Sequence, residues 1–218
     1  MTLLVEALPP LQRGVFVTGT DTGIGKSVVS AWLARRYGAD YWKPVQSGLA
    51  GETDSQLVAR LAELAPERVH PERYRLREPL SPHAAAERDG VTLDLGDFHL
   101  PETSQPLVVE GAGGALVPLN GAELMVDLMV HLGLPVMVAA RNRLGVINQV
   151  LMTLEVLRSR DLSVLGVILT GEENRVNEEA IEQHGRTAIL ARIPWMEPLT
   201  PQALLAASMH FDSTTEPY

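Results

Sequence analysis

Apolar residues follow two patterns that alternate along most of this chain. Short, nearly continuous apolar runs of strand length are separated by longer segments in which apolar residues recur every three or four positions. This alternation is typical of a mostly parallel sheet with helices on both faces, so the fold class is α/β. Strands are predicted at 14–18, 39–45, 107–109, 135–140, 164–169 and 189–193, and helices at 26–37, 54–65, 145–160, 177–184 and 201–209.

The most informative segments are two apolar runs and one amphipathic segment. Runs 107–109 and 135–140 contain no polar residue, as expected for central parallel strands that are covered on both sides. Segment 145–160 places Ile147, Val150 and Leu154 on one stripe, which indicates an amphipathic helix. Segment 66–106 is rich in Pro, Glu and Arg, and only short helices at 82–88 and 93–100 are predicted there.

Length and composition favour one domain with a sizeable core. The chain has 218 residues, of which 45% are hydrophobic, so we expect a single domain with an N-terminal extension at 1–13 and a tail at 197–218. The net charge of −9 argues against an extended contact with nucleic acid or an anionic membrane. The absence of cysteine and of a signal-like N-terminus leads us to expect a cytoplasmic protein. The spacing of the six histidines predicts no transition-metal site.

The strongest candidate chemistry lies between the first predicted strand and the first predicted helix. The stretch Val15-Phe-Val-Thr-Gly-Thr-Asp-Thr-Gly-Ile-Gly-Lys-Ser27 ends as a phosphate-binding loop does, although Thr20 holds the place of the first glycine and Gly19 comes one residue early. Amides at a helix N-terminus bind phosphate, so Lys26 is expected to reach the β and γ phosphates and Ser27 to ligate Mg²⁺. The alternative is a glycine-rich turn with a solvated lysine.

Two further segments place charged residues where strands are predicted to end. Glu110 follows the buried run 107–109 and precedes several glycines, and Asp54 begins a predicted helix. Together these carboxylates form a pair of the kind that holds Mg²⁺ on a triphosphate. Lys43 ends the short predicted strand 39–45; a lysine there is usually a solvated edge residue, and the surrounding motifs favour a functional role.

Taken together, the motifs resemble those of the dethiobiotin synthetases of biotin biosynthesis, a family with the P-loop NTPase fold. The loop 19–27 is similar to the family's G-T-D-T-x-V-G-K-T, early glycine included. Segments 43–48, 81–83, 109–114, 144–148 and 193–195 are similar to its K-P-V-x-S-G, S-P-H, V-E-G-A-G-G, L-G-x-I-N and I-P-W. These motifs keep their order from residue 14 to about residue 196, so the resemblance covers nearly the whole chain.

The resemblance implies a cyclo-ligase that converts 7,8-diaminopelargonate, CO₂ (or bicarbonate) and ATP into dethiobiotin, ADP and phosphate with Mg²⁺. It also implies a homodimer in which segment 144–148 reaches the neighbouring subunit's site. The catalytic residues would be Lys43, Lys26 and Thr22, the substrate-binding residues Thr22, Lys43, Ser47, Gly145, Val146, Ile147 and Asn148, and the metal ligands Ser27, Asp54 and Glu110. The nucleotide-binding residues would be Gly23, Ile24, Gly25, Lys26, Ser27, Val28, Asp54, Glu110, Gly111, Ala112, Gly113, Thr170, Gly171, Pro194, Trp195 and Met196.

The sequence departs from the family pattern at two places. Ser27 replaces the usual threonine but keeps a hydroxyl for Mg²⁺. Thr170 and Gly171 stand where the family commonly has Asn-Asp, with the asparagine reading adenine. Since a threonine hydroxyl cannot offer the donor and acceptor of an amide, we expect weak base selectivity and acceptance of other nucleoside triphosphates.

Two other functions share parts of this pattern. A partition or septum-placement ATPase would need a second lysine near the start of the loop, where this chain has Thr20 to Gly23, and a basic or amphipathic terminal segment. A purely regulatory nucleotide-binding module would need only the loop and would leave Lys43 and Ser47 without a role.

Overall fold

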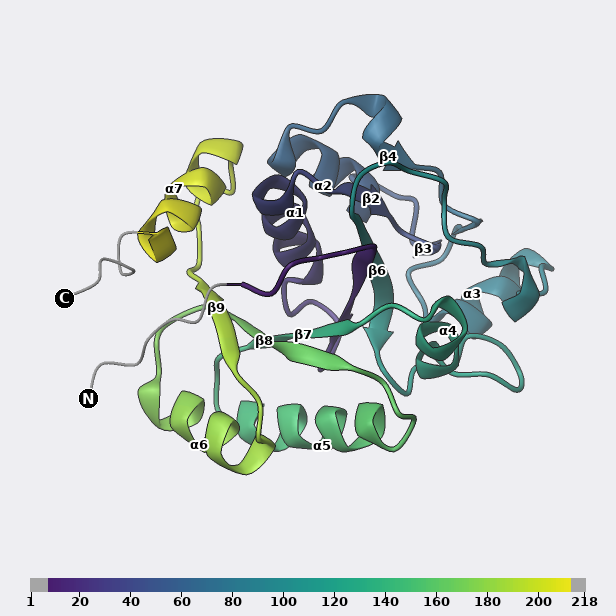
Figure 1. Cartoon of the computed structure of the whole chain (residues 1–218). Coiled ribbons are helices and arrows are strands. Elements are labelled where there is room, and N and C mark those ends of the chain that lie inside the picture. Colours follow the sequence, from purple (N-terminus) through teal and green to yellow (C-terminus); the bar gives the residue numbers. More distant parts are fainter. Residues whose placement is uncertain (1–7, 213–218) are drawn as a thin grey trace.

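A computed structural model describes residues 8–212 as an α/β domain built on a seven-stranded sheet (Figure 1). The strand order is β4-β2-β6-β1-β7-β8-β9 and every pairing is parallel. The strands of this sheet are β1 (Gly14–Gly19), β2 (Asp40–Trp42), β4 (Val69–His70), β6 (Leu107–Gly114), β7 (Val136–Arg141), β8 (Val164–Thr170) and β9 (Ile189–Ile193). Strands β3 (Val45–Ser47) and β5 (Tyr74–Leu76) form a separate parallel pair.

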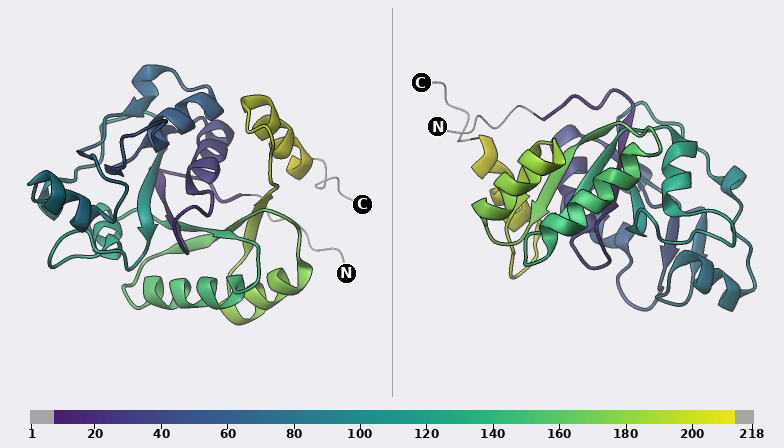
Figure 2. Two further views of the ribbon diagram at one scale, coloured as in Figure 1. Left: turned by 180° about the vertical axis from the view of Figure 1, so that it is seen from behind. Right: turned by 90° about the horizontal axis from the view of Figure 1, so that it is seen from below.

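Helices cover both faces of the sheet, as Figures 1 and 2 show. Helices α1 (Lys26–Tyr37), α2 (Asp54–Ala62) and α7 (Pro201–Asp212) lie on one face. Helices α4 (Met125–Leu132), α5 (Val146–Arg158) and α6 (Arg175–Gly185) lie on the other, and α3 (Pro82–Asp89) packs beside β3 and β5. The fold class and the P-loop arrangement predicted from the sequence are confirmed.

The alternation of side chains along β1 explains the two layers of core. Val15 and Val17 point into the core beneath α1 and α2, whereas Phe16 points into the core beneath α4 and α5. All three side chains are fully buried. A strand that is apolar at successive positions is therefore what a sheet with two covered faces requires.

The helix at 26–37 and the strand at 189–193 have the predicted bounds, and the other predicted strands of the large sheet shift by a few residues. The prediction was wrong for 39–45, because the chain leaves the large sheet after Trp42 and Val45 begins the smaller one. It was also wrong for 93–100, where the structure has a 3-10 turn, Leu95–Asp97. Strands β4 and β5 and helix α4 were not predicted.

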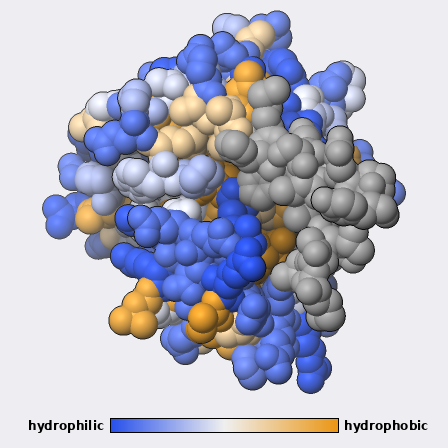
Figure 3. All heavy atoms as spheres, turned by 90° about the vertical axis from the view of Figure 1, so that its left-hand side faces the viewer, coloured by the Kyte–Doolittle hydropathy of each residue, from blue (hydrophilic) through white to orange (hydrophobic). Residues whose placement is uncertain are grey.

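The face seen in Figure 3 carries mostly hydrophilic residues, with smaller hydrophobic groups among them. No helix within residues 8–212 combines the length and the apolar character needed to cross a bilayer. The parts of the predicted extension and tail at 1–7 and 213–218 lie outside the described residues.

Candidate functional site

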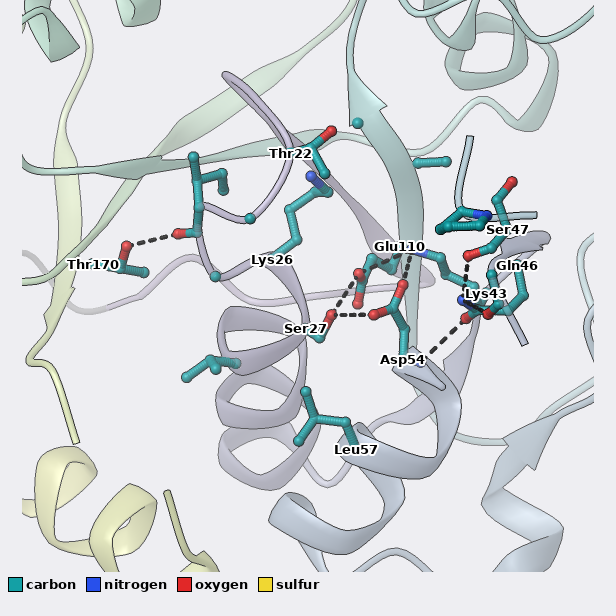
Figure 4. A pocket seen from close by; sticks show the side chains of 18 of the residues that line it. Thr22, Lys26, Ser27, Lys43, Gln46, Ser47, Asp54, Leu57, Glu110 and Thr170 are labelled. Atoms are coloured by element: carbon teal, nitrogen blue, oxygen red, sulfur yellow. Dashed lines mark hydrogen bonds and ion pairs between the residues drawn. The ribbon is translucent and has the colours of Figure 1, made fainter. Parts of the chain in front are cut away.

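A cavity of about 780 Å³ lies at the carboxyl ends of the strands, where open α/β sheets bind their ligands. The loop between β1 and α1 forms one wall, and the ends of β2, β3, β6, β8 and β9 supply most of the others. Figure 4 shows Lys26, Ser27, Lys43, Asp54 and Glu110 converging in it. The cavity therefore brings together motifs that lie far apart in the sequence.

The phosphate-binding loop has the backbone that its glycines permit. Gly25 caps α1 with φ 96°, a left-handed conformation that favours glycine, and α1 begins at Lys26. The Lys26 side chain is 7% exposed, and its Nζ donates a hydrogen bond to the Asp21 carbonyl oxygen at 2.8 Å. Burial, together with the nearby charge of Lys43, lowers the pKa of Lys26 to about 8. The loop thus places a buried cation beside the helix N-terminus, where a phosphate would bind.

Ser27, Asp54 and Glu110 form a compact oxygen cluster. The Ser27 Oγ lies 3.1 Å from Asp54 Oδ1 and 2.9 Å from Glu110 Oε1. Asp54 is held at the start of α2, where Thr53 and Gln56 form a capping box. Glu110 lies on β6 and is 1% exposed. Hydroxyl and carboxylate oxygens are the ligands that Mg²⁺ prefers. Elsewhere within residues 8–212, no group of three or more His, Asp or Glu side chains is gathered that could hold a metal ion.

Lys43 lies against the same two carboxylates. Its Nζ is 2.7 Å from Asp54 Oδ2 and 3.1 Å from both Glu110 Oε1 and the Gly111 carbonyl oxygen. The side chain is 3% exposed, so burial acts to lower the pKa of Lys43, but the two carboxylates outweigh it and the pKa is raised. Burial acts to raise the pKa of Asp54, but Lys43, Ser27 and Lys26 together outweigh it and the pKa is lowered. Lys43 is therefore a buried cation and not a solvated edge residue.

Tyr41 holds Glu110 from the other side. Its hydroxyl donates a hydrogen bond to Glu110 Oε2 at 2.9 Å. Burial and the neighbouring Glu110 charge raise the pKa of Tyr41 well above its usual value, so the phenol stays a donor. This contact fixes the carboxylate and was not predicted from the sequence.

Beyond Lys43 the cavity is lined by Thr22, Gln46 and Ser47. Ser47 Oγ is buried and has no hydrogen-bond partner within the part of the chain that the structure describes. Gln46 Oε1 accepts a hydrogen bond from the Asp54 amide at 3.1 Å, and Gln46 Nε2 donates to the Ser47 and Gly48 carbonyls. Gln46 was missed because it occupies the variable place of the K-P-V-x-S-G pattern, so the motif assigns it no role.

The opposite end of the cavity is lined by Thr170, Gly171, Pro194, Trp195 and Met196. The sequence predicts these residues to contact the nucleotide, and this stays a prediction. The Thr170 hydroxyl is already engaged, since it donates to the Ile24 carbonyl oxygen at 2.7 Å. Its methyl group packs against Gly25, where an added Cβ would lie 3.1 Å away. Thr170 therefore supports the phosphate-binding loop.

Most predicted site residues line this cavity, but segment 145–148 does not. The lining includes every predicted nucleotide-binding, catalytic and metal residue except Gly111, whose carbonyl oxygen binds Lys43. Gly145 caps α5 and Leu144 before it is fully exposed. Sequence reasoning also missed Arg141, a lining residue at the end of β7.

The parallel sheet, the glycine loop with its buried lysine and the Ser27–Asp54–Glu110 cluster define a P-loop nucleoside triphosphatase. A family model described as an AAA domain matches residues 13–203. A ParA family ATPase from Chlorobium tepidum TLS superposes with a TM-score of 0.50 at 14% identity, covering 94% of each chain, which shows a shared fold alone.

Sequence relatives narrow the class to one family. An ATP-dependent dethiobiotin synthetase BioD from Brucella ovis is 51% identical over 201 residues, 91% of this chain and 95% of the relative. A biotin biosynthesis bifunctional protein BioCD from Bordetella avium is 54% identical over 193 residues, but the aligned region covers 88% of this chain and only 42% of the bifunctional protein. The chain belongs to the ATP-dependent dethiobiotin synthetase family.

Proposed function

We propose that this protein closes the ureido ring of dethiobiotin from 7,8-diaminopelargonate, CO₂ and ATP, with Mg²⁺. The observation that carries the proposal is Lys43, a buried cation held against the acidic cluster beside the phosphate-binding loop. A carbamate and a triphosphate are both anionic, so bringing them together requires cations on both. Lys26 would serve the phosphates and Lys43 the carbamate and the moving phosphoryl group.

The chemistry divides into three steps. One amine of the substrate adds to CO₂ and loses a proton, which gives a carbamate. A carbamate oxygen then attacks the γ-phosphorus and ADP leaves. The second amine attacks the carbonyl carbon of this carbamic phosphate, phosphate leaves, and the five-membered ring closes with loss of a proton. Because the protein forms no covalent bond in these steps, its contribution is positioning and charge stabilisation.

Mg²⁺ would be held by Ser27, Asp54 and Glu110, with phosphate oxygens and water completing its shell. The fit rests on the oxygen atoms of these side chains, which lie within 3.1 Å of the Ser27 hydroxyl. When bound, the ion neutralises charge on the triphosphate. Lys43 holds the two carboxylates in the absence of the ion, so we expect its Nζ to move away from them when Mg·ATP binds. A structure with nucleotide and metal in which either carboxylate lies far from the ion, without a bridging water, would contradict this assignment.

The diamine substrate would bind between Thr22 and Ser47. The unpartnered Ser47 hydroxyl supports this, because a buried polar atom without a partner is costly unless a ligand satisfies it. The Gly113 backbone has φ 67° and an added Cβ there would meet Val117 at 2.7 Å, so glycine keeps this wall close to Thr22. The amides at the start of α5, residues 145–148, would hold the substrate carboxylate in the site of a second subunit. We further propose that the protein works as a homodimer in the cytoplasm.

The proposal is tested by supplying the purified protein with diaminopelargonate, bicarbonate and Mg·ATP and detecting dethiobiotin by mass spectrometry. Omission of any one substrate serves as the control and should abolish the product. If complete mixtures yield ADP but no dethiobiotin, the proposed reaction is wrong. The partition-ATPase alternative has little support, because a fold likeness at 14% identity shows the fold alone and the net charge is −9.

A further inference from the structure

Arg141 places a positive charge at the wall of the cavity. It ends β7 and is half-buried. Its guanidinium carbon lies 5.1 Å from the centroid of the Trp195 ring, a cation–π contact that orients the group. Its guanidinium forms no hydrogen bond or ion pair with another residue between 8 and 212. A fork of five N–H donors is thus held beside the cavity without acceptors.

The position of Arg141 in the sheet separates it from the triphosphate site. In the strand register Arg141 is opposite Thr170, and Thr170 is opposite Ile193, two residues before Trp195. The guanidinium reaches Trp195 and therefore lies toward the β8 and β9 end of the sheet. Figure 4 shows Thr170 on one side of the phosphate-binding loop, with Asp54 and Lys43 on the other. Arg141 therefore faces the end of the cavity at which the nucleoside would bind.

Other side chains at this end offer little that could read a base. The Thr170 hydroxyl donates to the Ile24 carbonyl, and Gly171 has no side chain. Pro194 and Met196 are apolar, and the Trp195 ring is stacked against Arg141. Among the described residues at this end of the cavity, the Trp195 indole keeps one free N–H, and Arg141 is the side chain that offers several free donors in one plane.

We propose that Arg141 reads the edge of the nucleobase and favours purines with a 6-keto group. Guanine and hypoxanthine present O6 and N7 as adjacent acceptors, which match the arginine fork, whereas adenine presents N7 beside an amino group that is itself a donor. GTP and ITP would then bind at least as tightly as ATP. The inference rests on the nucleotide use of the proposed function but not on dethiobiotin as the product.

The test is calorimetric titration of the protein with ADP, GDP and IDP in the presence of Mg²⁺ and without the other substrates. IDP is the decisive probe, because hypoxanthine carries a keto group where adenine carries an amino group. The wild-type protein should bind IDP and GDP at least as tightly as ADP. Arg141→Ala should lower the affinity for IDP and GDP by about ten- to a hundredfold and the affinity for ADP by less than about threefold.

Two variants separate recognition of the base edge from a non-specific effect of the positive charge of Arg141. Arg141→Lys keeps the charge but loses the fork, so it should lose most of the preference for IDP. Arg175→Ala removes an exposed arginine of α6 that is paired with Glu173 outside the cavity, and it should leave all three affinities unchanged.

Three results would overturn the inference. The wild-type protein could bind IDP more weakly than ADP, or Arg141→Ala could lower the affinity for all three nucleotides equally, or it could leave all three affinities unchanged. The equal loss would mean that Arg141 contacts ribose or phosphate. Because the titrations measure binding alone, a protein that keeps this base preference but makes no dethiobiotin would contradict the proposed reaction and leave the reading of Arg141 intact.

Discussion

Lys26 and Lys43 are both buried in one cavity, yet their surroundings assign them different tasks. Lys43 contacts two carboxylates, which raise its pKa against the effect of burial. Lys26 contacts a backbone carbonyl of its own loop, and burial lowers its pKa to about 8. We therefore expect the loop lysine to bind the phosphates, and Lys43 to act on the group that receives the phosphoryl.

This difference predicts that Lys43→Ala keeps nucleotide binding but loses turnover by about a hundredfold or more, the usual effect of removing one group that stabilises developing charge. Lys26→Ala should lose nucleotide binding itself. Calorimetry with ATP and a dethiobiotin assay on both variants measure the two effects. Near-normal turnover in Lys43→Ala, or unchanged ATP affinity in Lys26→Ala, would contradict these roles.

Thr170 is expected to act on every nucleotide alike, because its hydroxyl supports the loop through the Ile24 carbonyl. Thr170→Val keeps the size of the side chain and loses this hydrogen bond, which is worth about 1 kcal/mol. The affinity for ATP, GTP, CTP and UTP should therefore fall alike, by about fivefold. Thr170→Ser keeps the donor and is the matched control. A loss confined to ATP would show that Thr170 contacts the base, and our assignment of its hydroxyl would be wrong.

At the scale of elements, the junction between β3 and α2 depends on Gln46. This buried amide accepts a hydrogen bond from the Asp54 backbone and donates to two carbonyls of the segment that carries Ser47. It therefore links the proposed metal ligand to the proposed substrate contact. Loss of the Gln46 amide should therefore shift both Asp54 and Ser47.

We predict that Gln46→Met, which has a similar shape without the amide, raises the KM for diaminopelargonate and lowers the affinity for Mg²⁺, each by about fivefold or more. The estimate assumes a net loss of about 1 kcal/mol from each side of the broken link. Gln56→Met removes the capping box of the same helix and is the control. It should lower the thermal stability of the protein and leave the KM for diaminopelargonate nearly unchanged. Unchanged kinetics in Gln46→Met would show that the junction holds without the amide.

The elements that the sequence predicted best are those whose pattern is local. Segment 26–37 carries a helical stripe, and because a glycine loop precedes it and Gly38 follows it, both ends of α1 could be predicted. Strand β3 could not be separated from β2, because its partner β5 lies 29 residues further along and only tertiary structure pairs Val45 with Tyr74. Helix α4 was missed, since six of its eight residues are apolar and five of them are buried, which leaves only Asp127 and His131 to mark a polar face.

At the scale of the whole molecule, the motifs predicted which residues form the site but not how they contact one another. Ser27, Asp54 and Glu110 were predicted as metal ligands. The structure places the carboxylates of Asp54 and Glu110 within hydrogen-bond distance of the Ser27 hydroxyl. The contacts of Lys43 and Tyr41 with Glu110 depend on how β2 and β6 pair, which no local pattern encodes. Their roles in catalysis stay predictions.

The surface at α5 leads to a prediction about assembly. Leu144 is fully exposed and Met152 is 58% exposed, although both are apolar. If segment 144–148 completes a neighbouring site, Leu144→Asp should shift the protein toward monomers and lower the specific activity on dilution. Val176→Asp changes an apolar residue on α6 that is 74% exposed and serves as the control. Sedimentation and activity measured together would decide, and a monomer that is fully active at nanomolar concentration would contradict the shared site.

The central claim is that the phosphoryl group passes to a carbamate oxygen and not to water. Turnover with ¹⁸O-labelled CO₂, quenched within seconds and analysed by mass spectrometry, tests it directly. Each CO₂ brings two oxygen atoms, so the account predicts one ¹⁸O in the released phosphate and one in the ureido group of dethiobiotin. Unlabelled phosphate, with dethiobiotin absent or formed independently of it, would show that water takes the phosphoryl group and would contradict the mechanism.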